Sequence, residues 1–260
     1  SKSNLQSCFE IGKMKEDLNK LLDIAKEAAI LAGDFLAKRI NDDLKILHNQ
    51  GRDLKLQIDQ DAEALIKAHI KSKNHLPILA EESGISEELG DLFWVIDPLD
   101  GTSNFMRNIP ISCVAIAVMH KSVPVLGVIN DFNNNNLYFA HQEMPAFMNN
   151  DQISVSNITS SSEGTLVTGI PAKDTYTDAE FHEMITKFQS WKKVRMIGSA
   201  AMASAYVASG RADVYEEHGI FLWDIASGAA IVKAAGGNVD ISNIRKDYRV
   251  DAKFSNSYIK

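Results

Sequence analysis

The chain has 260 residues, of which 45% are hydrophobic and 23% are charged, and its formal net charge is −7. A chain of this length can bury most of its unfolded surface without a disulfide or a structural metal. The composition is ordinary for a globular protein, which excludes extensive disorder. The acidic balance argues against nucleic-acid binding as the main function, because the phosphate backbone would be repelled. We therefore expect no nucleic-acid partner.

The chain has two cysteines, Cys8 and Cys113. They are too few and too far apart for a disulfide framework or a zinc knuckle, and Cys113, within an apolar run, is expected to be a buried free thiol. No apolar stretch is long enough to span a bilayer, and the first residues do not resemble a signal peptide. We therefore expect a cytoplasmic protein with no membrane partner.

The chain shows no internal repeat and no linker, so we expect a single domain over residues 1–260. Residues 1–13 are polar, and the sequence leaves open whether they are native chain or a disordered, tag-derived stretch. Apolar residues at helical spacing predict an amphipathic helix over residues 16–39. Alternating apolar residues predict a strand over 53–58, and Asp59 or Asp61 is well placed as the N-cap of a second helix that runs through Ile70.

Strands dominate the middle of the chain. Apolar or alternating runs predict them at residues 77–80, 93–96, 112–119, 125–132, 137–140, 153–155 and 166–169. Pro98 is expected to end the second of these strands, because proline cannot donate a hydrogen bond to a central strand. Helices follow at 178–189, 199–208 and 225–235, the last ended by Gly236 and Gly237. This order indicates an α+β fold of packed layers, not a doubly wound parallel sheet.

Acidic residues follow one apolar strand directly. Asp97 and Asp100 can point into one space, with the Leu99 carbonyl between them. Hard oxygen ligands clustered in this way suit Mg²⁺. The segment Gly101–Ser103 leads into a helical turn, whose free N–H groups would bind an anion. The same segment is also a good turn sequence, so on its own it supports metal chemistry and a plain turn about equally.

Two further acidic sites tip this balance. Glu81 and Glu82 stand at the end of their own short strand, where the alternative is a solvated loop. Asp224 precedes a run of small residues, where the alternative is a helix N-cap. Three acidic sites, each after an apolar segment, favour metal chemistry over three unrelated structural roles.

Three blocks of sequence resemble the signature blocks of the inositol monophosphatase family. They are Ala80–Ser83, Asp97–Phe105 and Trp223–Gly228. Further similarity to the family lies in residues 53–59, 146–150 and 198–201, and order and spacing agree over about residues 18–258. The resemblance implies a layered α/β/α/β/α fold related to the sugar bisphosphatases, and often a homodimer.

The resemblance also assigns roles by position. Two or three Mg²⁺ ions would be held by Glu81, Asp97, the Leu99 carbonyl, Asp100 and Asp224. Thr102, oriented by Asp59, would help activate the attacking water, with Glu81 the third catalytic residue. The phosphate would be bound by backbone groups of Gly101, Thr102 and Ser103. The remaining substrate contacts would come from Ser199, Ala200, Glu217 and Asp224.

The function that follows from the resemblance is a lithium-sensitive, Mg²⁺-dependent phosphomonoesterase. Its leading substrate is myo-inositol monophosphate, a small phosphate ester, hydrolysed by metal-activated water. The alternatives are a 3′(2′),5′-bisphosphate nucleotidase, a fructose-1,6-bisphosphatase, and a non-catalytic member that binds a protein or RNA. Phe221 stands where some members have histidine and Met196 where some have serine, both near the leaving-group side. The seven histidines show no paired metal-ligand spacing, and we expect none to be catalytic.

Overall fold

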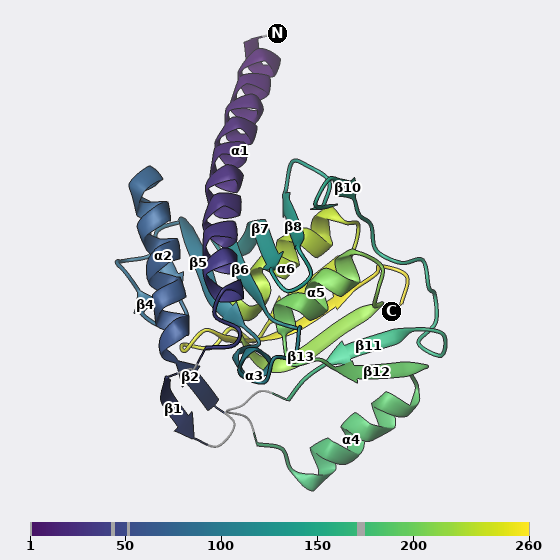
Figure 1. Ribbon diagram of the computed structural model, residues 1–260. Helices are drawn as coiled ribbons and strands as arrows, with labels where there is room; N and C mark the ends of the chain where they lie inside the picture. The colour runs from purple at the N-terminus through teal and green to yellow at the C-terminus, as the bar shows by residue number, and fades with distance from the viewer. Residues whose placement is uncertain (1, 43–44, 51–52, 171–174, 260) are drawn as a thin grey trace.

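The computed structural model describes residues 2–42, 45–50, 53–170 and 175–259. Figure 1 shows its elements arranged in five layers. The first layer contains helices α1 (Lys2–Ala37) and α2 (Gln57–Lys73), beside a small hairpin of β1 (Ile46–Gln50) and β2 (Asp53–Leu56). The layered α+β fold predicted from the sequence is confirmed.

The second layer is an eight-stranded sheet. Its strands, in order across the sheet, are β10 (Asp151–Gln152), β9 (Phe147–Met148), β8 (Asn136–His141), β7 (Val123–Asp131), β6 (Cys113–His120), β5 (Leu92–Asp100), β3 (Ile78–Ala80) and β4 (Gly84–Ile85). All neighbours are antiparallel except β3 and β5, which run parallel. Because β3 and β5 are parallel, their C-terminal ends lie at the same edge of the sheet, and the residues that follow them come close together.

Helices α5 (Ala200–Ala208) and α6 (Leu222–Ala234) form the third layer, between the two large sheets. The fourth layer is a five-stranded sheet with the order β12 (Lys193–Met196), β11 (Thr165–Thr168), β13 (Val214–Phe221), β15 (Arg249–Ser255) and β14 (Asn238–Ser242). Helix α4 (Asp178–Gln189) lies on its outer face, where Phe188 packs against Leu166 and Val214. A short helix, α3 (Thr102–Met106), follows β5.

Two hydrophobic cores lie on opposite faces of the eight-stranded sheet. One packs α1 and α2 against residues such as Trp94, Ile96 and Val128, and the other packs α5, α6 and the five-stranded sheet against residues such as Val95 and Ala117. Burial on both faces explains why β5, β6 and β7 read as nearly continuous apolar runs. No helix in the described part of the chain is long and apolar enough to cross a membrane.

The third layer lies unusually close to the sheet. A Cβ atom added to Gly127 of β7 would be 2.1 Å from the backbone oxygen of Ser227 on α6. A Cβ added to Gly228 would be 2.2 Å from the Cβ of Ser204 on α5. Only glycine permits such approaches of one backbone to a neighbouring element.

Several element boundaries differ from the sequence expectation. Helix α1 begins at Lys2, well before the predicted start at residue 16. Helix α2 begins at Gln57, so Asp59 is its third residue rather than its N-cap, and Asp59 accepts the backbone N–H of Leu56 at 2.9 Å. The predicted strand at 153–155 is wrong. Those residues form a connector in which the Val155 N–H donates to the Ala235 carbonyl outside any ladder.

The expectation that Pro98 ends its strand is also wrong. Strand β5 continues to Asp100, with a register shift between the Asp97–Ala115 pair and the Asp100–Cys113 pair. Such a bulge leaves a residue outside the ladder, so the missing N–H of Pro98 removes no sheet hydrogen bond. The bulge also re-aims the side chains that follow it, which separates the environments of Asp97 and Asp100.

Candidate active site

Three carboxylates from separate parts of the chain meet at one edge of the eight-stranded sheet. Glu81 follows β3 and continues its pairing, since its N–H donates to the Ile96 carbonyl at 3.1 Å. Asp97 lies on β5 and is buried. Asp224 lies in the first turn of α6 and accepts the Phe221 N–H at 3.2 Å. One carboxylate oxygen from each of the three lies within 4.8 Å of the other two.

The two oxygens of Asp97 have different surroundings. Oδ1 accepts the Leu99 N–H at 3.1 Å. Oδ2 is buried and meets no hydrogen-bond donor among the described residues. A buried carboxylate oxygen without a donor is costly, and the carboxylates of Glu81 and Asp224 lie close to Asp97. A hard divalent cation such as Mg²⁺ is the partner that this donor set fits.

Electrostatics support the same conclusion. Burial raises the pKa of Asp97 well above its usual value, and the charges of Glu81, Asp100 and Asp224 raise it further. Burial, followed by the charges of Asp100 and Glu81, likewise raises the pKa of Asp224. Like charges that crowd in this way destabilise a fold unless a cation or a proton offsets them. The group is therefore suited to metal binding and poorly suited to a purely structural role.

Asp100 is oriented differently from the other acidic residues. Its Oδ2 accepts hydrogen bonds from Ser199 Oγ at 2.5 Å and from the Ala201 N–H at 2.7 Å, at the N-terminus of α5. Burial raises the pKa of Asp100 to about 6, and the hydrogen bonds from Ser199 and Ala201 limit that rise. A carboxylate at a helix N-terminus is favoured by the free N–H groups and the helix dipole. Asp100 lies outside the three-carboxylate group found among the described residues.

Ser199 and Ala200, which the family resemblance predicts at the substrate pocket, belong to this same helix start. Ser199 is the N-cap of α5, and its Oγ accepts the Met202 N–H at 3.2 Å. The backbone of Ala200 adds a hydrogen bond to Asp100. The contact with Asp100 is their clearest role in the structure, and a contact with substrate stays a prediction.

Gly101 turns the chain between Asp100 and α3. Its φ is +88°, and an added Cβ would be 2.7 Å from the Ile111 carbonyl oxygen, so only glycine fits. Thr102 and Ser103 form the first turn of α3, whose backbone N–H groups have no partner within the helix. The Thr102 hydroxyl donates to the Leu99 carbonyl at 3.0 Å, which places a predicted catalytic group beside a predicted metal ligand.

The predicted pairing of Thr102 with Asp59 is consistent with the packing. Helix α3 contacts β2, and Asp59 follows β2 directly at the start of α2, with 2% of its surface exposed. One oxygen of Asp59 accepts the Leu56 N–H. The interaction between Asp59 and Thr102 itself stays a prediction.

Asn104 is a site residue that sequence reasoning passed over. Its side-chain amide donates to the Ile111 carbonyl and to the Ile197 carbonyl, both at 2.8 Å. It thereby joins α3 to the segments that precede β6 and α5. Its position inside the Asp97–Phe105 block was the only sequence signal that could have identified it.

Glu217 lies on β13 and is 8% exposed. Its Oε2 accepts the Tyr215 hydroxyl at 3.0 Å, and its carboxylate rests against Gly169, where an added Cβ would be 2.7 Å from Oε1. A cavity of about 330 Å³ beneath α4 reaches Glu217, and its lining includes Tyr176 and Lys187 but none of the three grouped carboxylates. The cavity is therefore lined by other residues than the three-carboxylate group, and Glu217 borders it.

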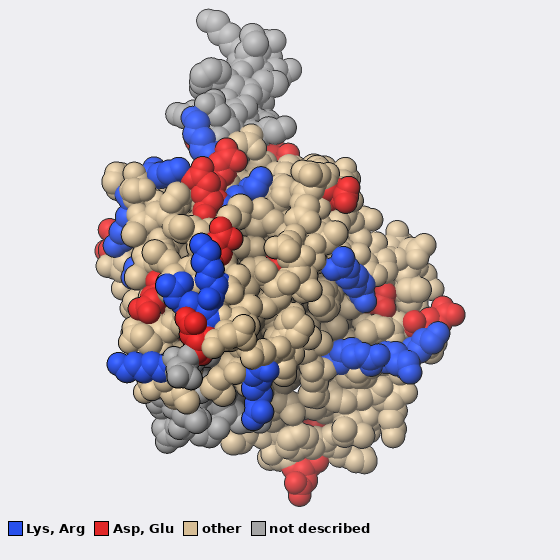
Figure 2. Space-filling model, in the orientation of Figure 1, with Lys and Arg blue, Asp and Glu red and all other residues tan. Residues whose placement is uncertain are grey.

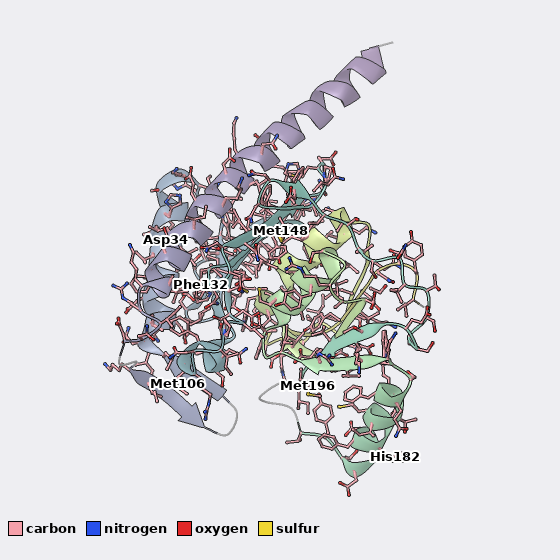
Figure 3. The ribbon with its side chains drawn as sticks, turned by 45° about the vertical axis from the view of Figure 1, so that its right-hand side comes forward. Asp34, Met106, Phe132, Met148, His182 and Met196 are labelled. Atoms are coloured by element: carbon pink, nitrogen blue, oxygen red, sulfur yellow. The ribbon has the colours of Figure 1, made fainter. Side chains whose placement is uncertain are left out.

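Two residues on the predicted leaving-group side have contrasting surroundings. Met196 is 52% exposed at the end of β12 (Figure 3). Phe221 is half-buried and stacks on Trp223, with ring centroids 4.6 Å apart and ring planes within 7°. His182, also labelled in Figure 3, lies on α4 at the margin of the molecule.

Comparison with known proteins agrees with this geometry. Residues 17–251 match the model of the inositol monophosphatase family. The chain belongs to the inositol monophosphatase family. Among curated relatives, the inositol-1-monophosphatase of a Synechocystis species is 38% identical and covers 86% of this chain and 79% of its own. The Nus factor SuhB of Pasteurella multocida is 39% identical and covers 85% of both chains.

Solved structures agree as well. The inositol monophosphatase of an Anabaena (Nostoc) species superimposes with a TM-score of 0.82 at 33% identity, covering 93% of this chain and 92% of the other. The extragenic suppressor protein suhB of Bartonella henselae gives the same TM-score at 28% identity, covering 92% and 94%. Family membership makes this protein a phosphatase, a hydrolase of phosphoric monoesters.

Proposed function

We propose that this protein is a Mg²⁺-dependent phosphomonoesterase of small phosphorylated polyols, with myo-inositol monophosphate as its leading substrate. The observation that carries the proposal is the group of Glu81, Asp97 and Asp224, with the buried, donorless Oδ2 of Asp97. Together with Asp100 and the Leu99 carbonyl, these residues would hold two or three Mg²⁺ ions. Bound Mg²⁺ would neutralise phosphate charge and make a water molecule more acidic.

The chain's own residues would bind and orient the substrate. The N–H groups at the start of α3, from Gly101 to Ser103, would donate to phosphate oxygens. Thr102, with its hydroxyl beside the Leu99 carbonyl, would hold the attacking water and pass on its proton, assisted by Asp59 and Glu81. These donors lie next to the carboxylates, so one phosphate group could reach both.

Glu217 supports a polyol as the leaving group. Its carboxylate is nearly buried and held by Tyr215, which fixes its direction. A fixed acceptor pairs well with a substrate hydroxyl, whereas a flat apolar group would offer it no donor. A 3′(2′),5′-bisphosphate nucleotide or fructose 1,6-bisphosphate is the alternative within the same class.

The test is phosphate release from inositol 1-phosphate, adenosine 3′,5′-bisphosphate and fructose 1,6-bisphosphate, each with Mg²⁺ and with a chelator. We expect release that depends on Mg²⁺ and a kcat/KM that is highest for inositol 1-phosphate. A higher kcat/KM for either other substrate would overturn the substrate proposal but keep the class. No release from any of the three would overturn both. We also expect millimolar lithium to inhibit turnover.

The names of several relatives favour a second candidate, binding of a macromolecular partner. Curated relatives between 35% and 39% identical carry the name Nus factor SuhB, as in Pasteurella multocida and Vibrio cholerae. Figure 2 shows Lys and Arg interleaved with Asp and Glu on one face, a pattern that does not favour nucleic acid there. Tight binding of a protein or RNA by an Asp97→Asn variant, which we expect to be inactive, would establish this second role.

We further propose that residues 1–260 form a single domain and that the protein is a homodimer, as the resemblance implies. Light scattering coupled to size-exclusion chromatography measures the mass directly. A single species near twice the mass of 28.7 kDa supports the dimer, and a monomer at micromolar concentration contradicts it.

A further inference from the structure

Three polar side chains lie on one face of α2 over more than two turns. Asp59, Glu63 and Lys67 are four residues apart, a spacing that puts side chains on one face of a helix. Asp59 and Glu63 are buried, with 2% and 3% of their surface exposed. A glutamate that is almost fully buried is rare without a specific partner. Glu63 therefore has a role that its place in the helix does not explain.

The partners of Glu63 and Lys67 lie in the turn that carries Glu81. Oε2 of Glu63 accepts the backbone N–H of Glu82 at 2.8 Å. Lys67 Nζ donates to Ser83 Oγ at 2.7 Å and lies 3.8 Å from Oε1 of Glu63. Two side chains of α2 thus hold the two residues that follow Glu81 in the chain.

Little apolar packing fixes this turn. Glu81 and Glu82 are half-buried and Ser83 is exposed. A groove of about 520 Å³ lies between α2 and the turn, lined by Gln60, Glu63, Ala64, Lys67, Glu82 and Ser83. The other side of the turn is tied to the sheet by the hydrogen bond from Glu81 N to Ile96 O. The position of the turn relative to α2 depends on the polar contacts of Glu63 and Lys67.

We propose that Glu63 and Lys67 are positioning residues that hold the 81–83 turn, and through it the carboxylate of Glu81, in place for the metal ion. The inference rests on the proposed Mg²⁺ site. Outer partners of this kind orient metal ligands, and their loss commonly lowers metal affinity 10- to 100-fold. Lys67 also supplies positive charge beside the buried carboxylate of Glu63.

The decisive comparison is between Glu63→Ala, which removes the acceptor, and Glu63→Gln, which keeps a side-chain oxygen of the same reach. We expect Glu63→Ala to raise the Kd for Mg²⁺, measured by calorimetry, at least tenfold. Glu63→Gln should bind within about threefold of wild type. KM for substrate should change little at saturating Mg²⁺. Lys67→Met should weaken Mg²⁺ binding severalfold, whereas Lys71→Met, at an exposed position one turn further along α2, should not.

Amide hydrogen exchange, measured in the presence of a chelator, tests how firmly the 81–83 turn is held when no metal is bound. The Glu82 amide should exchange faster in Glu63→Ala and near the wild-type rate in Glu63→Gln. A Glu63→Ala protein that is less stable but binds Mg²⁺ with the wild-type Kd would overturn the positioning role. A wild-type protein that fails to bind Mg²⁺ would overturn the proposed function and the inference together, so the two failures are distinguishable.

Discussion

Ser199 Oγ lies 2.5 Å from Oδ2 of Asp100, and this hydrogen bond joins residues 99 positions apart in the sequence. It connects the end of β5 to the start of α5, because Ser199 is also the N-cap of that helix. Asp100 therefore has a structural partner in addition to its predicted role at the metal site.

Substitution Ser199→Ala should cost about 2 kcal/mol of unfolding free energy, since it removes both an N-cap and a donor to a buried carboxylate. Urea denaturation in a chelator measures this cost without metal. Ser209→Ala is the matched control at the other end of α5, because its hydroxyl donates back to carbonyls of the same helix, those of Ala205 and Tyr206. Equal losses in the two variants would show that the contact with Asp100 adds nothing.

Gly101→Ala should lower the free energy of unfolding by about 2 kcal/mol or more. The alanine would have to adopt a positive φ, and its Cβ would clash with the Ile111 carbonyl oxygen. Gly84→Ala provides the comparison, since Gly84 also has a positive φ (+71°) but has nothing within 4 Å of an added Cβ. That variant should lose about 1 kcal/mol. Thermal unfolding of both proteins measures the difference, and similar melting temperatures would contradict the clash.

Asp97→Asn should abolish Mg²⁺-dependent turnover and yet stabilise the metal-free protein. The raised pKa of Asp97 means that the fold favours its protonated form, so the ionised side chain destabilises the fold at neutral pH. A neutral side chain of the same size removes that penalty, and we expect a gain of about 1–3 kcal/mol in a chelator. Added Mg²⁺ should stabilise wild type but not the variant. A variant that is less stable than the wild-type protein, with both measured in a chelator, would contradict this prediction.

A pH-dependent contact attaches α4 to the five-stranded sheet. The pKa of Glu216 is lowered to about 2, mainly by its hydrogen bond with His218 and then by Lys187, and the Glu216 contact raises the pKa of His218. The contribution of Glu216 to the stability of the fold is fully present above the pKa that this side chain has in the unfolded chain. It is lost as pH falls toward the folded pKa of about 2. The contribution of His218 is present below its unfolded pKa and is lost as pH rises through the folded value.

The contact should therefore be strongest between about pH 4.5 and pH 6.5. We expect Glu216→Gln to cost about 1 kcal/mol at pH 5.5 and less at pH 8.5, because the exposed partners are screened by solvent and the charge of His218 is lost at the higher pH. Melting temperatures at the two pH values measure the difference. A cost that is the same at both would exclude His218 from the contact.

The sequence signals pointed to three carboxylates that the structure brings together, for a physical reason, while their role as metal ligands stays a prediction. Glu81 and Asp97 follow apolar runs that can only be buried strands, and β3 and β5 are parallel, so both residues arrive at one edge of the sheet. Asp224 could be added because it precedes a run of small residues. These signals are local, and each lies within a few residues of the side chain that it identifies.

What the sequence could not predict depends on contacts across the fold. Nothing near Asp100 indicates that Ser199 will bind it, and nothing in α2 indicates that Glu63 will accept the Glu82 N–H. Pro98 was expected to end β5 because proline lacks an N–H group. The strand continues because a bulge accommodates the proline, and such a bulge leaves no pattern in the sequence of a single strand. Residues 153–155 have the composition of a strand, but they have no neighbouring strand to pair with in the structure.

The close approach of α6 to β7 also affects where α6 places Asp224. Gly127 lies in the same cross-strand row as Ala117 and Val95, and Val95 is two residues before Asp97 on β5. Ser227, whose backbone oxygen occupies the space beside Gly127, lies one turn after Asp224 on α6. A larger residue at 127 would have to displace Ser227, and we expect that displacement to shift Asp224 relative to Asp97. The spacing of these two carboxylates, which we propose as metal ligands, thus depends on a residue that has no side chain.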